Sequence, residues 1–211
     1  MLKILFITFI SACADPYCEE ELSGEESVLP LEEGVTFSIN NGQVFSNKKE
    51  VVVSFNSPQF DSICVSDSTE CTLWNDYTDS MIWHFDGEGP QYLYAWGSND
   101  EGQNFVGPTV QTVWIDTQKP VDGILTATHR GGQINLSWSG FEDSGTGIGR
   151  FKVVYTQGRE PTSCNDGYGL RVRSNEYTTH TVTPTGIYGY RVCAIDNANN
   201  MSYGNSTMVE F

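Results

Sequence analysis

Basic residues are scarce in this sequence of 211 residues, which has 11 Lys and Arg against 27 Asp and Glu and a formal net charge of −16. The acids are unevenly spread. Residues 15–34 hold eight acids and no base, residues 35–118 hold eleven acids against two lysines (−9), and residues 121–211 hold eight acids against seven bases (−1). Such a field repels phosphate backbones and anionic lipids, so nucleic acid is excluded as a partner.

Methionine is also scarce, with 4 residues, whereas Gly, Tyr, Phe and Trp number 21, 10, 11 and 5. Aromatic side chains suit half-buried pleated surfaces, and glycine suits turns. The composition therefore predicts an all-β fold of many short strands without long helices. The length allows two cores of about a hundred residues each.

The spacings that mark common catalytic and metal sites are missing. No two cysteines form a C-x-x-C pair, no H-x-x-H or H-x-x-x-H spacing joins His84, His129 and His180, and no G-x-S-x-G segment occurs. We therefore expect no catalytic residue, no cofactor and no enzyme activity.

One segment, Asp143-Ser-Gly-Thr146, matches the D-[ST]-G-[ST] signature of aspartic peptidases, in which two carboxylates share a proton to activate water. The chain holds one copy, so a dimer would be required, and no apolar-apolar-Gly partner segment follows. A Gly-rich loop from Glu142 to Gly149 explains the segment without catalysis. An aspartic peptidase acting through Asp143 stays an alternative.

Acidic residues also cluster between positions 61 and 79, where their oxygens could serve a hard cation such as calcium. They are Asp61, Asp67, Glu70, Asp76 and Asp79. No D-x-[DN]-x-[DN]-G loop contains them, and acidic loops of an acidic protein are usually solvated. We therefore predict no metal ligand, and calcium stays open as an alternative.

The chain begins with one lysine, a short apolar run and small residues, which is the layout of a secretory signal rather than a membrane span. Ile10-Ser-Ala-Cys13 resembles the bacterial lipobox, in which cleavage before the cysteine makes it the acylated first residue. This resemblance implies a signal peptide over residues 1–12, lipidation of Cys13, and an acidic tether over residues 13–34. Ala14 after the cysteine implies the outer membrane or the cell surface. An ordinary signal peptidase would instead release a periplasmic or secreted protein that begins at Asp15.

An exported chain meets oxidising surroundings, in which cysteine pairs persist. Pairing between neighbours in the sequence predicts two disulfides, Cys64–Cys71 and Cys164–Cys193, each worth about 2–4 kcal/mol. Cys18 is left over in the tether, either free or paired between molecules.

Apolar residues alternate with polar ones along several segments, which indicates half-buried strands. In the segment 91–96, Tyr92, Tyr94 and Trp96 share one face, and Leu93 and Ala95 share the other. Alternation alone does not say which face points inward. If the aromatic set points outward, it forms a candidate ligand surface, to which Trp74 is added.

The segments 89–96, 99–104 and 113–120 resemble the closing half of bacterial immunoglobulin-like modules. Those modules commonly have an aromatic strand, a D-x-x-G-N turn and a last strand that ends in I-D-T-x-x-P, which here is Ile115-Asp-Thr-Gln-Lys-Pro120. The resemblance implies an immunoglobulin-like β-sandwich over residues 35–119, followed by a very short linker at Pro120.

The segments Ile134-Asn-Leu-Ser-Trp138 and 151–155 resemble strands B and C of fibronectin type III domains. Residues 182–188 fit the L-x-P-x-x-x-Y corner of that family, with Val182 in place of Leu, and the resemblance implies that the Tyr188 hydroxyl pins this corner. Side chains at period two, from residue 188 to residue 194, then fall on one face, as a buried strand requires. The resemblance implies a fibronectin type III-like β-sandwich over residues 120–211.

Together these resemblances imply an exported bacterial cell-envelope protein with two sandwich modules. We expect a non-catalytic binding or adhesion module for a protein or polysaccharide at the cell surface, held at the membrane by its N-terminal lipid. A structural spacer or a subunit of an envelope complex is the alternative. The acidic first module, with its aromatic strand and disulfide, is the better candidate for binding, and the second is the better candidate for a scaffold.

Overall fold

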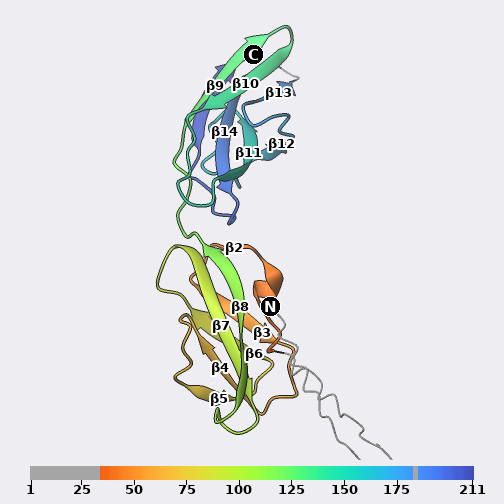
Figure 1. Ribbon diagram of the computed structural model, residues 1–211. Helices are drawn as coiled ribbons and strands as arrows, with labels where there is room; N and C mark the ends of the chain where they lie inside the picture. The colour runs from red at the N-terminus through yellow and green to blue at the C-terminus, as the bar shows by residue number, and fades with distance from the viewer. Residues whose placement is uncertain (1–33, 183–184) are drawn as a thin grey trace, which may run out of the picture. The chain divides into compact units, whose positions relative to one another are not determined.

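The computed structural model describes residues 34–182 and 185–211. The expected signal peptide, Cys13, Cys18 and nearly all of the acidic tether lie outside the described residues. The described residues form β-strands and one short 3-10 helix, Asn40–Gly42, and they build two β-sandwiches that follow one another along the chain (Figure 1). The predicted all-β fold with two sandwiches is confirmed.

The first sandwich has two sheets, with strand orders β1-β3-β6 and β2-β8-β7-β4-β5. Its strands are β1 (Phe37–Ile39), β2 (Phe45–Ser46), β3 (Glu50–Phe55), β4 (Ser62–Ser66), β5 (Trp74–Asp76), β6 (Ser80–His84), β7 (Gly89–Ser98) and β8 (Phe105–Ile115). Neighbouring strands are antiparallel, except that β2 runs parallel to β8. The β7–β8 hairpin lies within the larger sheet, between β2 and β4.

The core of the first sandwich forms because each strand turns alternate side chains inward. Strand β3 contributes Val51, Val53 and Phe55, all buried, and the residues between them are more exposed. From the opposite sheet, β7 and β8 contribute buried aliphatic residues. They are Leu93, Ala95, Val113 and Ile115.

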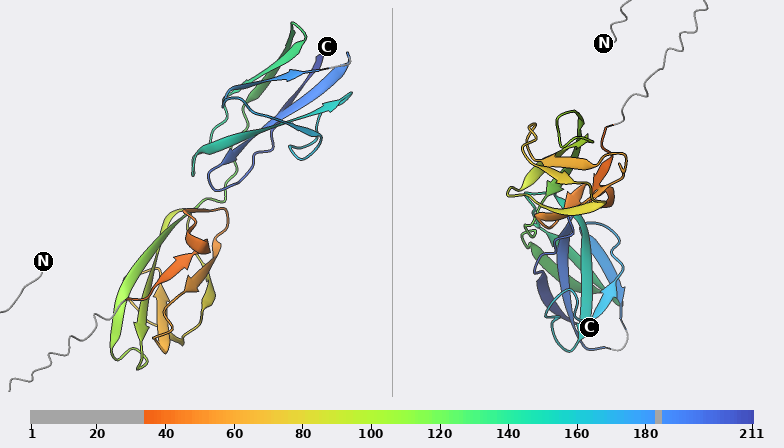
Figure 2. Two further views of the ribbon diagram at one scale, coloured as in Figure 1. Left: turned by 90° about the vertical axis from the view of Figure 1, so that its right-hand side faces the viewer. Right: turned by 90° about the horizontal axis from the view of Figure 1, so that it is seen from below.

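The second sandwich, drawn in green to blue in Figure 2, has two sheets. Their strand orders are β13-β10-β9 and β12-β11-β14-β15, and all of their neighbouring strands are antiparallel. Its strands are β9 (Ile124–Arg130), β10 (Gln133–Ser139), β11 (Ile148–Gln157), β12 (Tyr168–Leu170), β13 (Tyr177–Thr181), β14 (Ile187–Asp196) and β15 (Asn205–Glu210). Its core gathers Leu136 and Trp138 from β10 against the inward face of β14. Trp138 is buried, as expected for the tryptophan of this strand.

Strand β14 is buried on both faces, so its predicted inward residues are buried but burial does not alternate along it. Tyr188, Tyr190, Val192 and Ala194 are all buried. The corner that precedes this strand includes residues 183–184, which lie outside the described residues. The role predicted for the Tyr188 hydroxyl therefore stays a prediction.

Both predicted disulfides are present. Cys64 on β4 bonds to Cys71 in the loop before β5, and Cys164 in the loop between β11 and β12 bonds to Cys193 on β14. Cys193 points away from the tyrosine-lined core, so its bond ties the outer side of β14 to a loop, where it packs with Val154 and Met201. Disulfides persist in oxidising compartments, so the two bonds indicate an extracytoplasmic protein.

Residues 61–79 contain more regular structure than the clustered acids suggest. Strands β4 and β5 lie in this stretch, and β4 pairs with β7 at the centre of the sheet. Ile63 is fully buried because β4 places it in the core between the two sheets. Across the described residues, no helix has the length and apolar character that crossing a bilayer requires.

Candidate ligand-binding face

Strand β7 turns its aliphatic residues inward and its tyrosines outward. Leu93 and Ala95 are 0% exposed, whereas Tyr92 is 51% exposed and Tyr94 is half-buried. The inward choice follows from packing, since the small Ala95 and the branched Leu93 fit the dense interior between two sheets. The aromatic set therefore lies on the outer face of the sheet, the orientation that alternation alone left undecided.

Strand β8 extends this outer surface sideways. In the antiparallel register, Trp114 lies beside Pro90, Thr112 beside Tyr92, and Val110 beside Tyr94. Trp114 is 38% exposed, and Val110 is also exposed. No Asp, Glu, Lys or Arg occurs in 89–98 or 105–115, so these two strands present rings, aliphatic groups and hydroxyls without a charge.

Trp96 lies on the same side of the sheet but does not offer an open ring. It is 3% exposed, next to Tyr94, with ring centroids 6.3 Å apart. The pairing of β7 with β8 shifts register between Ala95 and Gly97, and a Cβ at Gly107 would come within 3.2 Å of Trp96. Trp96 therefore packs beneath the more exposed Tyr94, and its ring is almost completely shielded from solvent.

Trp74 joins the surface from the edge strand β5. It lies beside Cys64, which in turn lies beside Trp96, so the Cys64–Cys71 disulfide is part of the same row. The Trp74 ring packs at a tilt against Phe105, with centroids 6.0 Å apart, and Phe105 is exposed. We call the outer surface formed by Trp74, Tyr92, Tyr94, Trp96, Phe105 and Trp114 the aromatic face.

Two members of the aromatic face, Phe105 and Trp114, were missed by the sequence analysis. A signal for Trp114 was present, because Val110, Thr112 and Trp114 alternate with residues that include the buried Val113 and Ile115. Phe105 carried no such signal. It follows the turn, and its place beside Trp74 depends on a strand about thirty residues earlier in the chain, at 74–76.

The turn between β7 and β8 holds one end of the aromatic face in place. The Ser98 hydroxyl donates to Asp100 and accepts from the backbone N–H of Gly102, and Asp100 accepts from the backbone N–H of Asn104 at 2.8 Å. Hydrogen bonds from the backbone and side chain of Asn104 lower the pKa of Asp100. This network fixes Gly102, over which the Trp74 indole lies. The turn aspartate therefore caps backbone groups, as its Asx-type sequence suggests.

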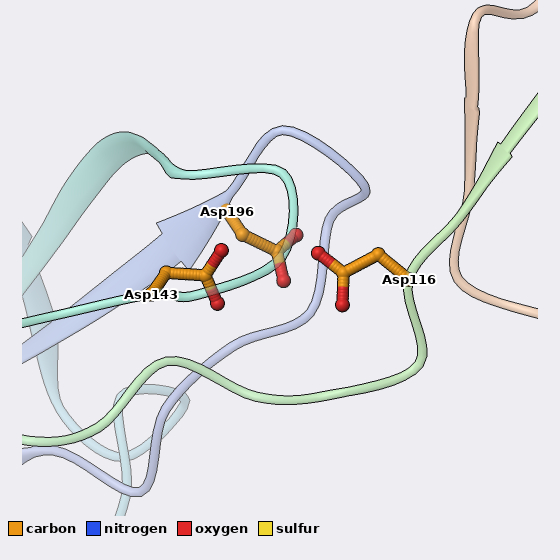
Figure 3. A group of neighbouring side chains, drawn as sticks. All are labelled: Asp116, Asp143 and Asp196. Carbon is orange, nitrogen blue, oxygen red and sulfur yellow. The ribbon is translucent and has the colours of Figure 1, made fainter. Parts of the chain in front are cut away.

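A second cluster, separate from the aromatic face, gathers three carboxylates from distant parts of the sequence. Asp116 follows β8, Asp143 lies in the loop between β10 and β11, and Asp196 ends β14 (Figure 3). One oxygen from each lies within 4.8 Å of the other two, and no other group of three acidic, histidine or cysteine ligands occurs among residues 34–182 and 185–211. We call this cluster the aspartate triad.

Each member of the aspartate triad caps loop backbone. Asp116 accepts from both the backbone N–H and the hydroxyl of Thr146 at 2.7 Å, and Asp143 accepts from the backbone N–H of Gly147 at 2.7 Å. Asp196 accepts from the backbone and side-chain N–H groups of Asn200. A Cβ at residue 145 would overlap the Asp116 carboxylate, so glycine is needed there.

The aspartate triad brings carboxylates of like charge together in a largely buried site. Asp116 and Asp196 are buried, and none of the ion pairs found in the described residues involves the triad. Burial raises the pKa of Asp196, the hydrogen bonds from Asn200 oppose this effect, and the charges of Asp116 and Asp143 add to it. Three such carboxylates can share a proton or offer oxygen ligands to a hard cation.

The peptidase alternative for Asp143 gains no support from this environment. The nearest carboxylates are the buried Asp116 and Asp196, and their oxygens are occupied by N–H and O–H donors of the surrounding loops. The five acids between positions 61 and 79 are not brought together as a ligand set within the described residues, where the triad is the cluster that forms.

No protein-family model and no curated protein sequence matches this chain. Among solved structures, the fibronectin(III)-like modules of CbhA from Clostridium thermocellum align over 83% of this chain and 93% of theirs, with 13% identity and a TM-score of 0.49. Domains A168-A170 of titin align over 82% of this chain and 64% of theirs, with 16% identity and a TM-score of 0.50. A segment of two fibronectin type III domains from chicken tenascin aligns over 85% of this chain and 100% of its own, with 11% identity and a TM-score of 0.35. At these identities the likeness concerns the fold alone, and this chain is an all-β protein of two tandem β-sandwiches.

Proposed function

We propose that this chain is an exported, non-catalytic binding protein whose aromatic face takes a neutral polysaccharide. The observation that carries the proposal is the outward, uncharged set of rings on β7 and β8, with Tyr92 and Trp114 open to solvent. A soluble monomer rarely leaves a contiguous apolar patch of this kind bare unless it binds something.

The charge of the first module favours a neutral ligand. Residues 35–118 carry a net charge of −9, from eleven acids against two lysines, so anionic polymers are repelled. Sugar rings have apolar faces that pack on aromatic rings, and their hydroxyls need hydrogen-bonding partners. The Thr112 hydroxyl beside Tyr92 provides such a partner within the row of rings.

The contacts that hold the aromatic face in a fixed arrangement favour a binding role. The Cys64–Cys71 disulfide and the turn network around Asp100 hold Trp74 and Phe105 at one end of the hairpin. A ring that is already ordered loses little conformational freedom on binding, and this favours affinity.

The export route is part of the same proposal. Cleavage before Cys13 and acylation of that residue would leave the acidic segment as a solvated tether between the membrane and the first sandwich. Intact-mass measurement of protein extracted from membranes tests this step: a diacylglyceryl group on Cys13 is expected, and a water-soluble chain that begins at Asp15 would contradict it.

Affinity gel electrophoresis with uncharged soluble polysaccharides tests the binding step. We expect slowed migration in a gel that contains a β-glucan, a xylan or a mannan, and recovery of normal migration in the double variant Tyr92→Ala/Trp114→Ala. The matched control is Val52→Ala/Ile82→Ala, which removes apolar side chains that are exposed on the other sheet.

The result that overturns the proposal is unchanged migration in every polysaccharide, or retardation that the Tyr92→Ala/Trp114→Ala variant retains. Capture of one envelope protein that depends on Trp114 would identify a protein partner in place of a polysaccharide. Retention of neither kind of partner would leave the chain as a structural spacer.

A further inference from the structure

A cavity of about 630 Å³ opens on the second sandwich, away from the aromatic face and from the aspartate triad. It lies at the end of β10, where the chain leaves the sheet through Ser139 and Gly140. Its size falls within the range of small-molecule sites, which are about 300–1,000 Å³.

One wall of the cavity is a row of hydroxyl groups. Ser137 on β10 lies between Thr126 on β9 and Tyr177 on β13, so three hydroxyl-bearing residues cross the sheet side by side. All three are exposed, and none of their hydroxyls has a hydrogen-bond partner among the described residues. They are available to a ligand.

Aromatic residues of the core edge also line the cavity. Phe151 packs against Trp138 with centroids 5.5 Å apart and against Phe141 with centroids 5.4 Å apart, and all three line the cavity. Because rings and hydroxyl groups line the same cavity, the site is amphipathic and fits a ligand that has both apolar faces and polar edges.

Two further groups limit the chemistry of the ligand. Glu176 is the only charged residue that lines the cavity, and no Lys or Arg does, so an anionic ligand would be repelled. The indole N–H of Trp138 is buried and has no hydrogen-bond partner. A buried donor without an acceptor costs free energy, and an oxygen that reaches it, from a ligand or an ordered water in the cavity, removes that cost.

We propose that this cavity is a binding site for a neutral saccharide unit. The ring faces of Phe141 and Phe151 receive the apolar face of the sugar, the Thr126–Ser137–Tyr177 row pairs with its hydroxyls, and Glu176 accepts from two of them. The inference uses none of the residues of the aromatic face, so either site can be tested and can fail without the other.

Tryptophan signals distinguish the two sites. Trp138 is the one tryptophan in residues 121–211, and the other four, at positions 74, 83, 96 and 114, belong to the first sandwich. In full-length protein with ¹⁵N-labelled tryptophan, the Trp138 indole signal is identified by its loss in Trp138→Phe. Glucose, galactose, mannose and N-acetylglucosamine are then titrated separately, with NMR detection.

We expect at least one sugar to shift the Trp138 signal in a saturable way. Tyr177→Ala removes one hydroxyl of the row together with its ring, and it should weaken that binding about tenfold. Tyr168→Ala, which removes a tyrosine that is exposed on the opposite sheet, should leave it unchanged. Unchanged thermal unfolding of both variants confirms that they fold.

Several outcomes would overturn the inference. They are a Trp138 signal that no sugar moves in a saturable way, a shift that Tyr177→Ala leaves intact, and a shift produced by ethanolamine but by none of the sugars, since that would identify a cation held by Glu176. Sugar-dependent shifts confined to the first-sandwich tryptophans would support the aromatic face and contradict this second site.

Discussion

The hydroxyl of Tyr190 lies 2.9 Å from Nδ1 of His180, inside a ring of tyrosines in the second sandwich. The Tyr155 ring packs on the His180 imidazole with ring centroids 4.2 Å apart. The Tyr188 ring lies edge-on to the imidazole with centroids 6.1 Å apart. Burial lowers the pKa of His180 below its ordinary value of 6.5 and raises the pKa of Tyr190. The folded protein therefore favours the neutral form of this histidine.

Stability should fall as the solution is acidified through the histidine range. Because the pKa of His180 is lower in the folded state than in the unfolded state, the unfolded chain takes up the proton first. The contribution of neutral His180 to the free energy of unfolding is fully present above pH 6.5, the ordinary histidine pKa. It is lost as the pH falls below that value and through the lower pKa of the folded state. Urea unfolding at steps from neutral to mildly acidic pH measures this loss, and His180→Gln should flatten the curve. His129→Gln, a change at an exposed histidine, is the control, and an equal slope in wild type and His180→Gln would contradict the prediction.

The two disulfides should differ in their contribution to stability. The loop closed by Cys164–Cys193 spans 29 residues of sequence separation and that closed by Cys64–Cys71 spans 7. Because the entropy of the unfolded chain falls with the length of the closed loop, Cys164→Ala/Cys193→Ala should lower the free energy of unfolding by about 1 kcal/mol more than Cys64→Ala/Cys71→Ala. Urea unfolding of the two double variants measures the difference, and a larger loss from the shorter loop would contradict this account.

Removing one charge from the aspartate triad should stabilise the protein when divalent cations are absent. An asparagine at position 143 can still accept from the Gly147 N–H, so Asp143→Asn relieves repulsion without losing that bond. We expect a gain of about 1 kcal/mol in excess chelator. Glu142→Gln, the same change of charge one residue earlier and outside the triad, should have little effect. Lower stability of Asp143→Asn in chelator would show that the repulsion argument is wrong.

Asp116 should behave in the opposite way when its side chain is removed. Its carboxylate accepts from the backbone N–H and the hydroxyl of Thr146. Asp116→Ala therefore leaves the backbone N–H of Thr146 without an acceptor. We expect a loss of about 1–3 kcal/mol, which thermal or urea unfolding detects. Thr146→Ser keeps both donors and should stay close to wild type.

Gly102 should be far less tolerant of a side chain than Gly42. Both have a positive φ, +88° and +81°, so alanine is strained at either position, but a Cβ at Gly102 would also overlap the Trp74 indole, whereas nothing lies within 4 Å of one at Gly42. Gly42→Ala should cost about 1–2 kcal/mol from backbone strain alone. Gly102→Ala should cost more and should change the tryptophan fluorescence. Equal losses in the two variants would mean that the Trp74 contact contributes nothing.

Much of the fold could be predicted from local patterns. Alternating residues from 188 to 194 predicted a buried strand because a pleated strand sends successive side chains to opposite faces, and all four predicted inward residues are buried. The disulfides followed from sequence distance, since short loops are the easiest to close. The strand β4 was harder to find, because a short strand in the middle of a sheet reveals itself mainly through its partners.

The sequence by itself determined that Tyr92, Tyr94 and Trp96 share one side of a strand, that the chain is acidic, and that its two halves differ in charge. Only the tertiary structure decided that this side faces outward, because the inward choice depends on which side chains fill the space between two sheets. It also brought Asp116, Asp143 and Asp196 within reach of one another and formed the cavity beside Trp138. Both features join residues that are far apart in the chain, and a periodic pattern along one strand carries no information about such contacts.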